Sequence, residues 1–461
     1  MNFSKYFGDK AFYRRVLSVA GPILIQNVIT NFVSLLDNIM VGQVGTEPMS
    51  GVAIVNQLIF VFNLCIFGGL AGPGIFSAQF FGKRDLDGVR SSFRAKLYIG
   101  FGAVVVFATV FLTAGSTLIS QFLHEGSDDL DLAATLEYGK AYLKVMLLQL
   151  IPFAFMQCYA SPLRETGETL LPMKAGIIAV LVNLCGNYIL IYGKFGAPEL
   201  GVVGAAIATV ISRFVECGIV VIWTHTHRQR CLFAPGLYRT LRVPGELMKK
   251  IAKMGMPLLV NEVLWSAGMT MLNQCYSIRG LEVVSATNIA STVSNLFFCF
   301  FLAMGNAISI MIGQLLGAGE LERAVDEDRK LTIFTVVMNI AVGALMALLA
   351  PLIPRLYNTT DTVKAIAVNM LLVSAAMMPF SSFTNAAYFT LRSGGKTVIT
   401  FLFDCGFTWV VNVPLAFILS RFTGMPIIPM YVCIQSLEFI KCIIGFFLVR
   451  SRIWVNNLVR E

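Results

Sequence analysis

Long apolar segments follow one another along almost the whole chain, and they constrain its fold more than any other feature. A helix needs about 20 mostly apolar residues to cross the hydrocarbon core of a bilayer. Segments of this kind lie at residues 16–40, 51–76, 97–119, 138–160, 172–192, 200–224, 251–276, 284–312, 331–356, 364–390, 397–419 and 426–449. The sequence therefore predicts an all-α membrane protein with twelve transmembrane helices.

The composition excludes several other classes. Hydrophobic residues make up 56% of the chain and charged residues 13%, against about 25% charged in soluble proteins. The ten cysteines include no CxxC pair and mostly lie in apolar segments, which predicts packing rather than disulfides or a metal site. The net charge of +9 comes without a nucleic-acid-binding motif, so we expect no nucleic-acid partner.

Basic residues gather in alternate segments between the predicted spans, most densely at 83–96, 228–253 and 450–460. Cytoplasmic segments of membrane proteins are rich in lysine and arginine. The pattern therefore predicts a multi-pass protein of the cell (inner or plasma) membrane with both termini in the cytoplasm. We expect these basic residues to contact lipid headgroups.

The two halves of the chain repeat each other. At a constant offset of 235, matching pairs are Pro22 and Pro257, Gly45 and Gly280, Gln79 and Gln314, and Gly82 and Gly317. Each half then holds six spans and begins and ends on the same side. We expect six-helix bundles at 1–225 and 249–461, a basic cytoplasmic linker at 226–248, and a pseudo-two-fold axis along the membrane normal.

Several segments carry a family resemblance. They are VAGPILIQNVITNFVSLLDNIMVGQVG and its echo KMGMPLLVNEVLWSAGMTMLNQ, SAQFFGKRD and IGQLLGAGE, and PLRETGET, LRSGGKT and GVVGAAIATVISR. In this order they resemble the multidrug and toxic compound extrusion (MATE) family, bacterial type. The resemblance implies an antiporter that exports amphipathic or cationic small molecules by alternating access between its bundles, against sodium or proton entry. We expect a monomer without a cofactor.

Asp37 lies near the outer end of the first predicted span. An ionisable group inside a span is costly and is a functional candidate by default. One interpretation is that its carboxylate reaches the interfacial water. The other is that it binds a cation or a proton, and the position matches the aspartate of the family's first helix.

Asn183 and Asn187 share one face of the predicted span at 172–192, because they are four residues apart. Their amide oxygens would complete a sodium or proton site with Asp37, and Thr209 is a weaker candidate ligand. The alternative is a hydrogen bond between helices. Relatives often carry an aspartate where this chain has Asn187, which weakens the assignment to sodium.

Glu262 is the corresponding candidate in the second half, where it matches a glutamate that some relatives use for cation or substrate. Their accompanying acid is missing here, and Asp404 is expected to supply a charge from another helix.

Two pairs with opposite charges lie three residues apart, Arg213 with Glu216 and Glu438 with Lys441. We expect each pair to neutralise itself within its own helix; the alternative is that they line the cleft and meet charged substrate. Arg213 and Lys441 are the basic residues that lie deepest inside the predicted spans, and the others fall close to the span ends.

Four prolines fall within predicted spans and are candidate hinges, because proline kinks a membrane helix. They are Pro22, Pro152, Pro257 and Pro379.

Two other functions compete. A flippase for a lipid-linked precursor needs a strongly cationic cavity, which two basic residues do not supply. A membrane-embedded enzyme is not expected, since no HExxH or GxSxG motif occurs. The sequence leaves open the substrate, the choice between sodium and proton, and the conformational state.

Overall fold

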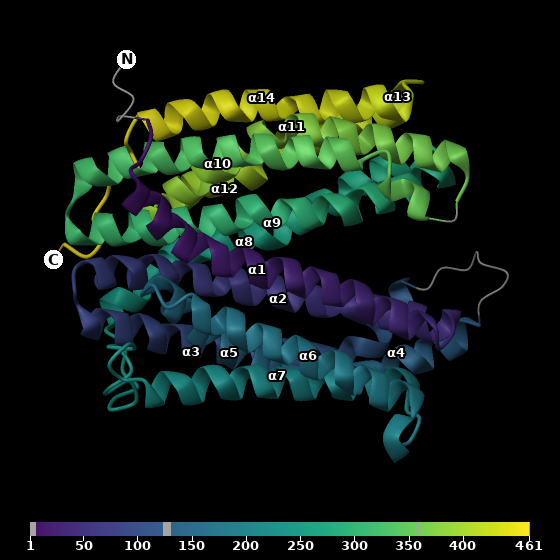
Figure 1. Ribbon diagram of the computed structural model, residues 1–461, viewed down its shortest axis with the longest axis horizontal. Coiled ribbons are helices and arrows are strands. Elements are labelled where there is room, and N and C mark those ends of the chain that lie inside the picture. Colours follow the sequence, from purple (N-terminus) through teal and green to yellow (C-terminus); the bar gives the residue numbers. More distant parts are fainter. Residues whose placement is uncertain (1–5, 123–130, 358, 461) are drawn as a thin grey trace. The chain divides into compact units, whose positions relative to one another are not determined.

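The computed structural model describes residues 6–122, 131–357 and 359–460, and in these ranges the regular structure is helical throughout (Figure 1). The prediction of an all-α fold is confirmed. The α-helices are α1 (Lys10–Gly42), α2 (Thr46–Gly82), α3 (Leu86–Phe122), α4 (Leu132–Met146), α5 (Leu150–Glu165), α6 (Leu170–Tyr192), α7 (Gly201–Thr226), α8 (Gly245–Ser277), α9 (Leu281–Ala318), α10 (Leu321–Leu349), α11 (Asp361–Ser393), α12 (Thr397–Phe401), α13 (Val413–Phe422) and α14 (Ile427–Arg450).

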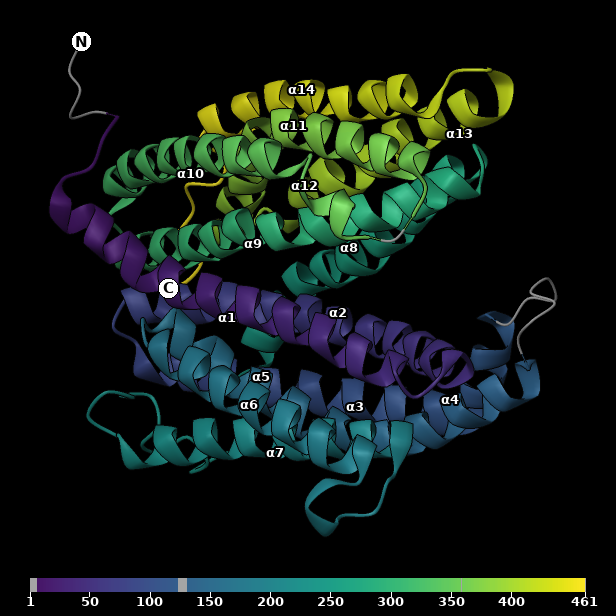
Figure 2. The same ribbon diagram turned by 45° about the vertical axis from the view of Figure 1, so that its right-hand side comes forward.

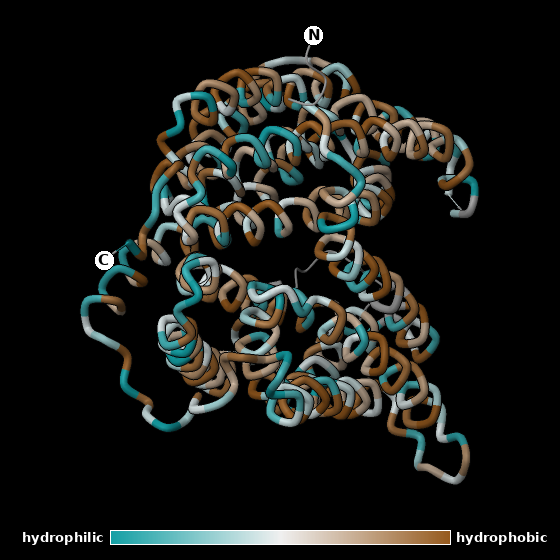
Figure 3. Tube along the Cα trace, turned by 60° about the vertical axis from the view of Figure 1, so that its left-hand side comes forward, coloured by the Kyte–Doolittle hydropathy of each residue, from teal (hydrophilic) through white to brown (hydrophobic). Residues whose placement is uncertain are grey.

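These helices account for the predicted spans. Among the described residues, ten continuous helical segments are long and apolar enough to cross a membrane, and α1 and α8, with 33 residues each, complete the predicted twelve. Figure 3 shows the hydrophobic residues along the helices and the hydrophilic ones mainly at their ends. Two spans are composite: α4 and α5 form one, and α12 and α13 form another around two π-helical turns.

The candidate hinge prolines occupy two kinds of position. Pro22, Pro257 and Pro379 lie inside α1, α8 and α11 as expected. Pro152 instead lies in the first turn of α5, just after the 3-10 turn Leu147–Gln149. The predicted helix at 138–160 is therefore interrupted before this proline, because a proline is tolerated best in the first turn of a helix. The hinge role stays a prediction.

The chain forms two compact units. Unit 1 comprises Met1–Leu24, Ala78–Arg84 and Lys253–Glu461, and unit 2 comprises Ile25–Ser77 and Asp85–Ala252. The chain passes from unit 1 to unit 2 within α1, two residues after Pro22. Unit 1 therefore includes the described start of α1 and the last turn of α2.

Unit 1 is built around α9, α10, α11 and α14, which lie side by side (Figure 2). Its largest core brings Val16 and Ala20 of α1 against buried residues of α9, α10 and α11, including Ala307, Leu331 and Leu391. In unit 2, α6 packs along α7, and α5 packs against α3 and α7. These contacts place the polar residues of α3, α5, α6 and α7 within reach of one another.

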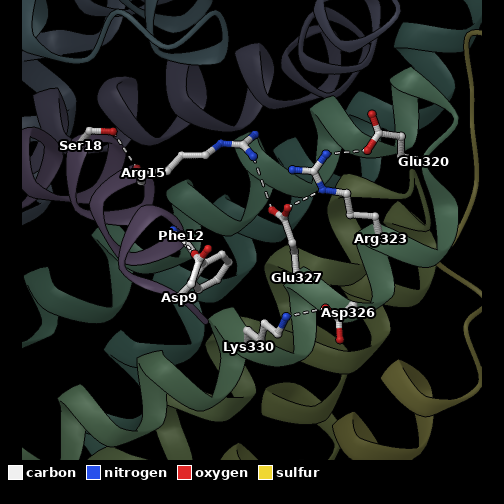
Figure 4. A network of polar contacts seen from close by, with 9 residues as sticks. All are labelled: Asp9, Phe12, Arg15, Ser18, Glu320, Arg323, Asp326, Glu327 and Lys330. Carbon is white, nitrogen blue, oxygen red and sulfur yellow. Dashed lines mark hydrogen bonds and ion pairs between the residues drawn. The ribbon is translucent and has the colours of Figure 1, made fainter. Parts of the chain in front are cut away.

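A charged network at the start of α1 and α10 holds these two helices together in unit 1 (Figure 4). Arg15 of α1 lies 3.6 Å from the Glu327 carboxylate, which also pairs with Arg323 at 2.9 Å. Arg323 pairs with Glu320 at 2.8 Å. Glu327 is almost fully buried, so two arginines compensate a carboxylate that is removed from water.

The internal repeat has a direct structural counterpart inside unit 1. A Cβ added to Gly82 of α2 would overlap the backbone carbonyl of Gln314 in α9, and a Cβ added to Gly317 would overlap that of Gln79. These four residues are two matching pairs of the repeat, so the contact is reciprocal. Glycine is needed at both places because only a residue without a side chain permits such a close approach.

The linker between α7 and α8 is folded onto unit 2. Arg94 of α3 donates hydrogen bonds to the carbonyl oxygens of Leu237 at 3.0 Å and Gly236 at 3.3 Å. Tyr98 donates to that of Leu241 at 2.9 Å. The linker is shorter than its predicted range, since α8 already begins at Gly245.

Candidate functional site

Asp37 of α1 is the centre of a polar cluster in unit 2. The Asn187 amide nitrogen of α6 donates to its carboxylate at 2.6 Å. The orientation of the Asn183 amide that satisfies all its neighbours donates to both Asp37 oxygens, at 2.9 and 3.0 Å, and accepts from the Thr209 hydroxyl of α7 at 3.1 Å. The structure therefore brings the four predicted ion-coupling residues together.

The helical spacing of α6 places Asn183 and Asn187 on the side of the helix that faces Asp37. Residues four apart lie one above the other on a helix face, so Asn183 and Asn187 both point at α1. Their side chains are buried, at 6% and 1% exposed, and α1 places Asp37 five residues before its end. The hydrogen bonds of Asp37 are therefore made to buried amides of a neighbouring helix.

The cluster is rich in oxygen ligands. The Asn187 amide oxygen is buried and has no hydrogen-bond partner among the described residues. Together with the Asp37 carboxylate and the Thr209 hydroxyl, it offers the kind of oxygens that bind hard cations. Within the described ranges, no group of three His, Cys, Asp or Glu side chains is placed to hold a metal ion.

Two neighbours of Asp37 were not found from the sequence. Tyr142 of α4 donates a hydrogen bond to the Asn56 side-chain oxygen of α2 at 3.2 Å, and it lies close enough to Asp37 to interact electrostatically. Tyrosines are common in membrane helices, so no sequence signal distinguished this one. Arg213 is a further electrostatic neighbour of Asp37, and it pairs with Glu216 at 2.8 Å as predicted.

A second charged cluster in unit 2 is formed by residues of α3 and α5. Lys96 of α3 is fully buried and its ammonium lies 2.5 Å from the Glu165 carboxylate of α5, while Ser161 bonds to both groups. Arg164 donates to the Gln26 side-chain oxygen at 3.1 Å and interacts with nearby Glu216 and Glu165.

These cations correct one prediction. Lys96 and Arg164 are also basic residues within membrane-length helical segments, because α3 begins ten residues before Lys96 and the composite span of α4 and α5 ends one residue after Arg164. The predicted spans stopped short of both. Each cation is close to a carboxylate, so the cluster does not form the uncompensated positive surface that a pyrophosphate carrier needs.

Unit 1 contains a third cluster, around Asp404. The Lys441 ammonium of α14 lies 2.7 Å from the Asp404 carboxylate, and the Asn261 amide of α8 donates to its other oxygen at 3.2 Å. Glu262, next to Asn261, interacts electrostatically with Asp404 and with Arg392 of α11. Asp404 therefore brings a second carboxylate near Glu262, as expected.

The prediction that Glu438 and Lys441 pair within their helix is wrong. Lys441 makes its ion pair with Asp404 of another helix, and Glu438 accepts a hydrogen bond from Thr384 of α11 at 3.0 Å. The ion pair between the helices is mostly buried, at 11% and 18% exposed, and the sequence spacing carries no information about it.

Membrane-length helices, an internal repeat, and buried carboxylates held by polar groups of neighbouring helices are typical of a polytopic membrane transporter. The MatE family model matches residues 22–189 and 257–418. The chain therefore belongs to the MatE family of membrane transporters. The two matches begin at Pro22 and Pro257, which are a matching pair of the repeat.

Relatives and solved structures agree with this family. The "Probable multidrug resistance protein NorM" of Thermotoga maritima is 26% identical over 89% of this chain and 86% of its own length. The "Probable multidrug resistance protein YoeA" of Bacillus subtilis is 24% identical over 89% and 88%. An outward-facing multidrug resistance MATE transporter has a TM-score of 0.85 at 20% identity, with 97% of both chains covered. The Vibrio cholerae MATE transporter VcmN has a TM-score of 0.86 at 17% identity, covering 98% of this chain and 99% of its own.

Proposed function

We propose that this chain is a cation-coupled antiporter that exports amphipathic or cationic small molecules, with sodium or a proton as the coupling ion. Its membership of the MatE family and the names of its multidrug-resistance relatives support export. The observation that carries the proposal of coupling is the Asp37 carboxylate of α1, which accepts hydrogen bonds from two buried asparagines of α6.

The arrangement explains how ion binding would act on the protein. An ionised Asp37 accepts hydrogen bonds from the Asn183 and Asn187 amides, and charge-assisted bonds of this kind are strong. A proton or a sodium ion at the carboxylate competes with these bonds and changes the charge of the cluster by one unit. The attachment of α1 to α6 therefore depends on the ion, which is the differential interaction that a population shift requires.

The orientation and assembly belong to the same proposal. The protein acts as a monomer in the plasma or inner membrane, with both termini in the cytoplasm and lipid headgroups around its basic segments. The halves 1–225 and 249–461 alternate access to the two sides, and the prolines Pro22, Pro152, Pro257 and Pro379 act as hinges.

A transport assay tests this function. The purified protein is reconstituted into liposomes, and movement of the fluorescent cation ethidium is followed under an imposed sodium gradient, an imposed proton gradient, or neither. One of the two gradients should drive ethidium against its own gradient. Equal, downhill movement under all three conditions would contradict coupling.

A further inference from the structure

The helix that carries Asp404 is locally irregular. Two π-helical turns, Leu402–Gly406 and Thr408–Asn412, separate α12 from α13. Turns of this type are rare and are frequent at functional sites. Trp409 in the second turn donates a hydrogen bond to the Leu264 carbonyl of α8 at 2.8 Å. The irregular segment is thereby tied to α8, two residues beyond Glu262.

The surroundings of the Lys441 ammonium have the features that recognise an organic cation. Asp404 supplies a carboxylate at 2.7 Å, and the Phe403 ring centroid lies 5.4 Å from the same nitrogen. Both side chains of the ion pair are mostly buried, at 11% and 18% exposed. A carboxylate beside an aromatic face in a desolvated place binds ammonium groups well.

A second, independent group points to a ligand. Asn261 is only 2% exposed and uses its amide nitrogen on Asp404, while its amide oxygen has no hydrogen-bond partner among the described residues. A buried acceptor without a partner is costly. Beside the Asp404 carboxylate, this oxygen provides a further lone pair for a cationic group.

The first half of the chain is built differently at the matching place. Arg213 and Lys441 correspond at an offset of 228, and at this offset Asp404 corresponds to Gly176. Arg213 finds its carboxylate within its own helix, at Glu216. Lys441 instead crosses to a carboxylate on another helix, so the cross-helix pair is specific to the second half.

We propose that Lys441 is a built-in counter-ion of Asp404, which the cationic group of a transported substrate displaces. Asp404, Asn261 and Phe403 then hold the substrate's positive charge in the place that the ammonium occupies in this structure. The inference rests on the proposed export of cations and identifies where their charge binds. Competition from a tethered ammonium lowers the affinity for a cation and so favours its release.

Binding to the purified full-length protein in detergent tests the inference. Fluorescence anisotropy measures the affinity for ethidium, a permanent organic cation, and for fluorescein, an anion. If Lys441 covers Asp404 about nine-tenths of the time, Lys441→Gln should bind ethidium about tenfold more tightly. Lys249→Gln is the matched control, because that lysine belongs to an exposed pair, and it should bind like the wild type. Fluorescein binding should not change.

Two further variants keep the inference falsifiable. The double variant with Lys441→Gln and Asp404→Asn should lose the tighter ethidium binding of Lys441→Gln. Asp404→Asn alone should bind ethidium more weakly than the wild type. This single variant tests the inference even if Lys441→Gln does not fold. Unchanged ethidium affinity in Lys441→Gln and Asp404→Asn would overturn the inference, as would weaker fluorescein binding in Lys441→Gln. Binding is measured without a gradient, so a failure of ion-driven transport is a separate result.

Discussion

Removing one partner of the buried pair of Lys96 and Glu165 should strongly destabilise unit 2. The two side chains are 0% and 10% exposed and the charged atoms lie 2.5 Å apart. Replacing one partner of such a pair leaves an uncompensated charge and costs about 3–5 kcal/mol. Ser161 still donates to Glu165 in Lys96→Met and Arg164 remains nearby, so we expect a value near the lower end.

The assay is unfolding of the purified protein in mild detergent, followed by circular dichroism as denaturant is added. Lys96→Met should lower the free energy of unfolding by about 3 kcal/mol. The double variant with Glu165→Gln should recover most of this loss, because it removes both charges. Lys140→Met is the matched control: it breaks an exposed pair with Glu137 and should cost at most about 1 kcal/mol. Equal destabilisation in the single and double variants would refute the reasoning.

Two other predictions follow from the contacts and the topology. Gly82→Ala and Gly317→Ala should each reduce the yield of folded protein, because the added Cβ overlaps a backbone carbonyl. Gly102→Ala is the control, because its Cβ would enter open space, and its yield should not change. Size-exclusion chromatography measures the yields, and normal yields of all three variants would contradict the prediction. In a background without exposed native cysteines, Phe195→Cys should react with a membrane-impermeant maleimide added to intact cells and Gln229→Cys should not; reaction at Gln229 would reverse the proposed orientation.

The sequence was sufficient for those parts of the fold that depend on local composition and spacing. Apolar length predicted the spans, and the helical period of four predicted that Asn183 and Asn187 face the same way. Whether that face meets Asp37 depends on how α1 and α6 pack, and the family resemblance alone supplied this expectation. The sequence showed Gly82 and Gly317 as a matching pair of the repeat, but it did not predict that each would lie against the backbone of the other helix.

Contacts between distant helices were the part that could not be predicted. Lys96 and Arg164 look like ordinary basic residues at the ends of apolar segments, and they are enclosed only because α3 and the composite span of α4 and α5 are longer than the predicted spans. Lys441 has a carboxylate three residues away, which is a sufficient partner by local rules. Its actual partner Asp404 lies in a π-helical turn of another helix, and no spacing in the sequence signals this turn.

The measurement that tests the account most directly compares substrate binding with gradient-driven transport in Asp37→Asn. Asparagine keeps the size and polarity of the side chain but cannot carry the charge that an ion or proton would neutralise. Asp361→Asn is the matched control, since that aspartate is fully exposed, and it should behave as the wild type in both assays. We predict that Asp37→Asn binds ethidium as the wild type does and loses its uphill transport; full gradient-driven transport by this variant would contradict the central claim.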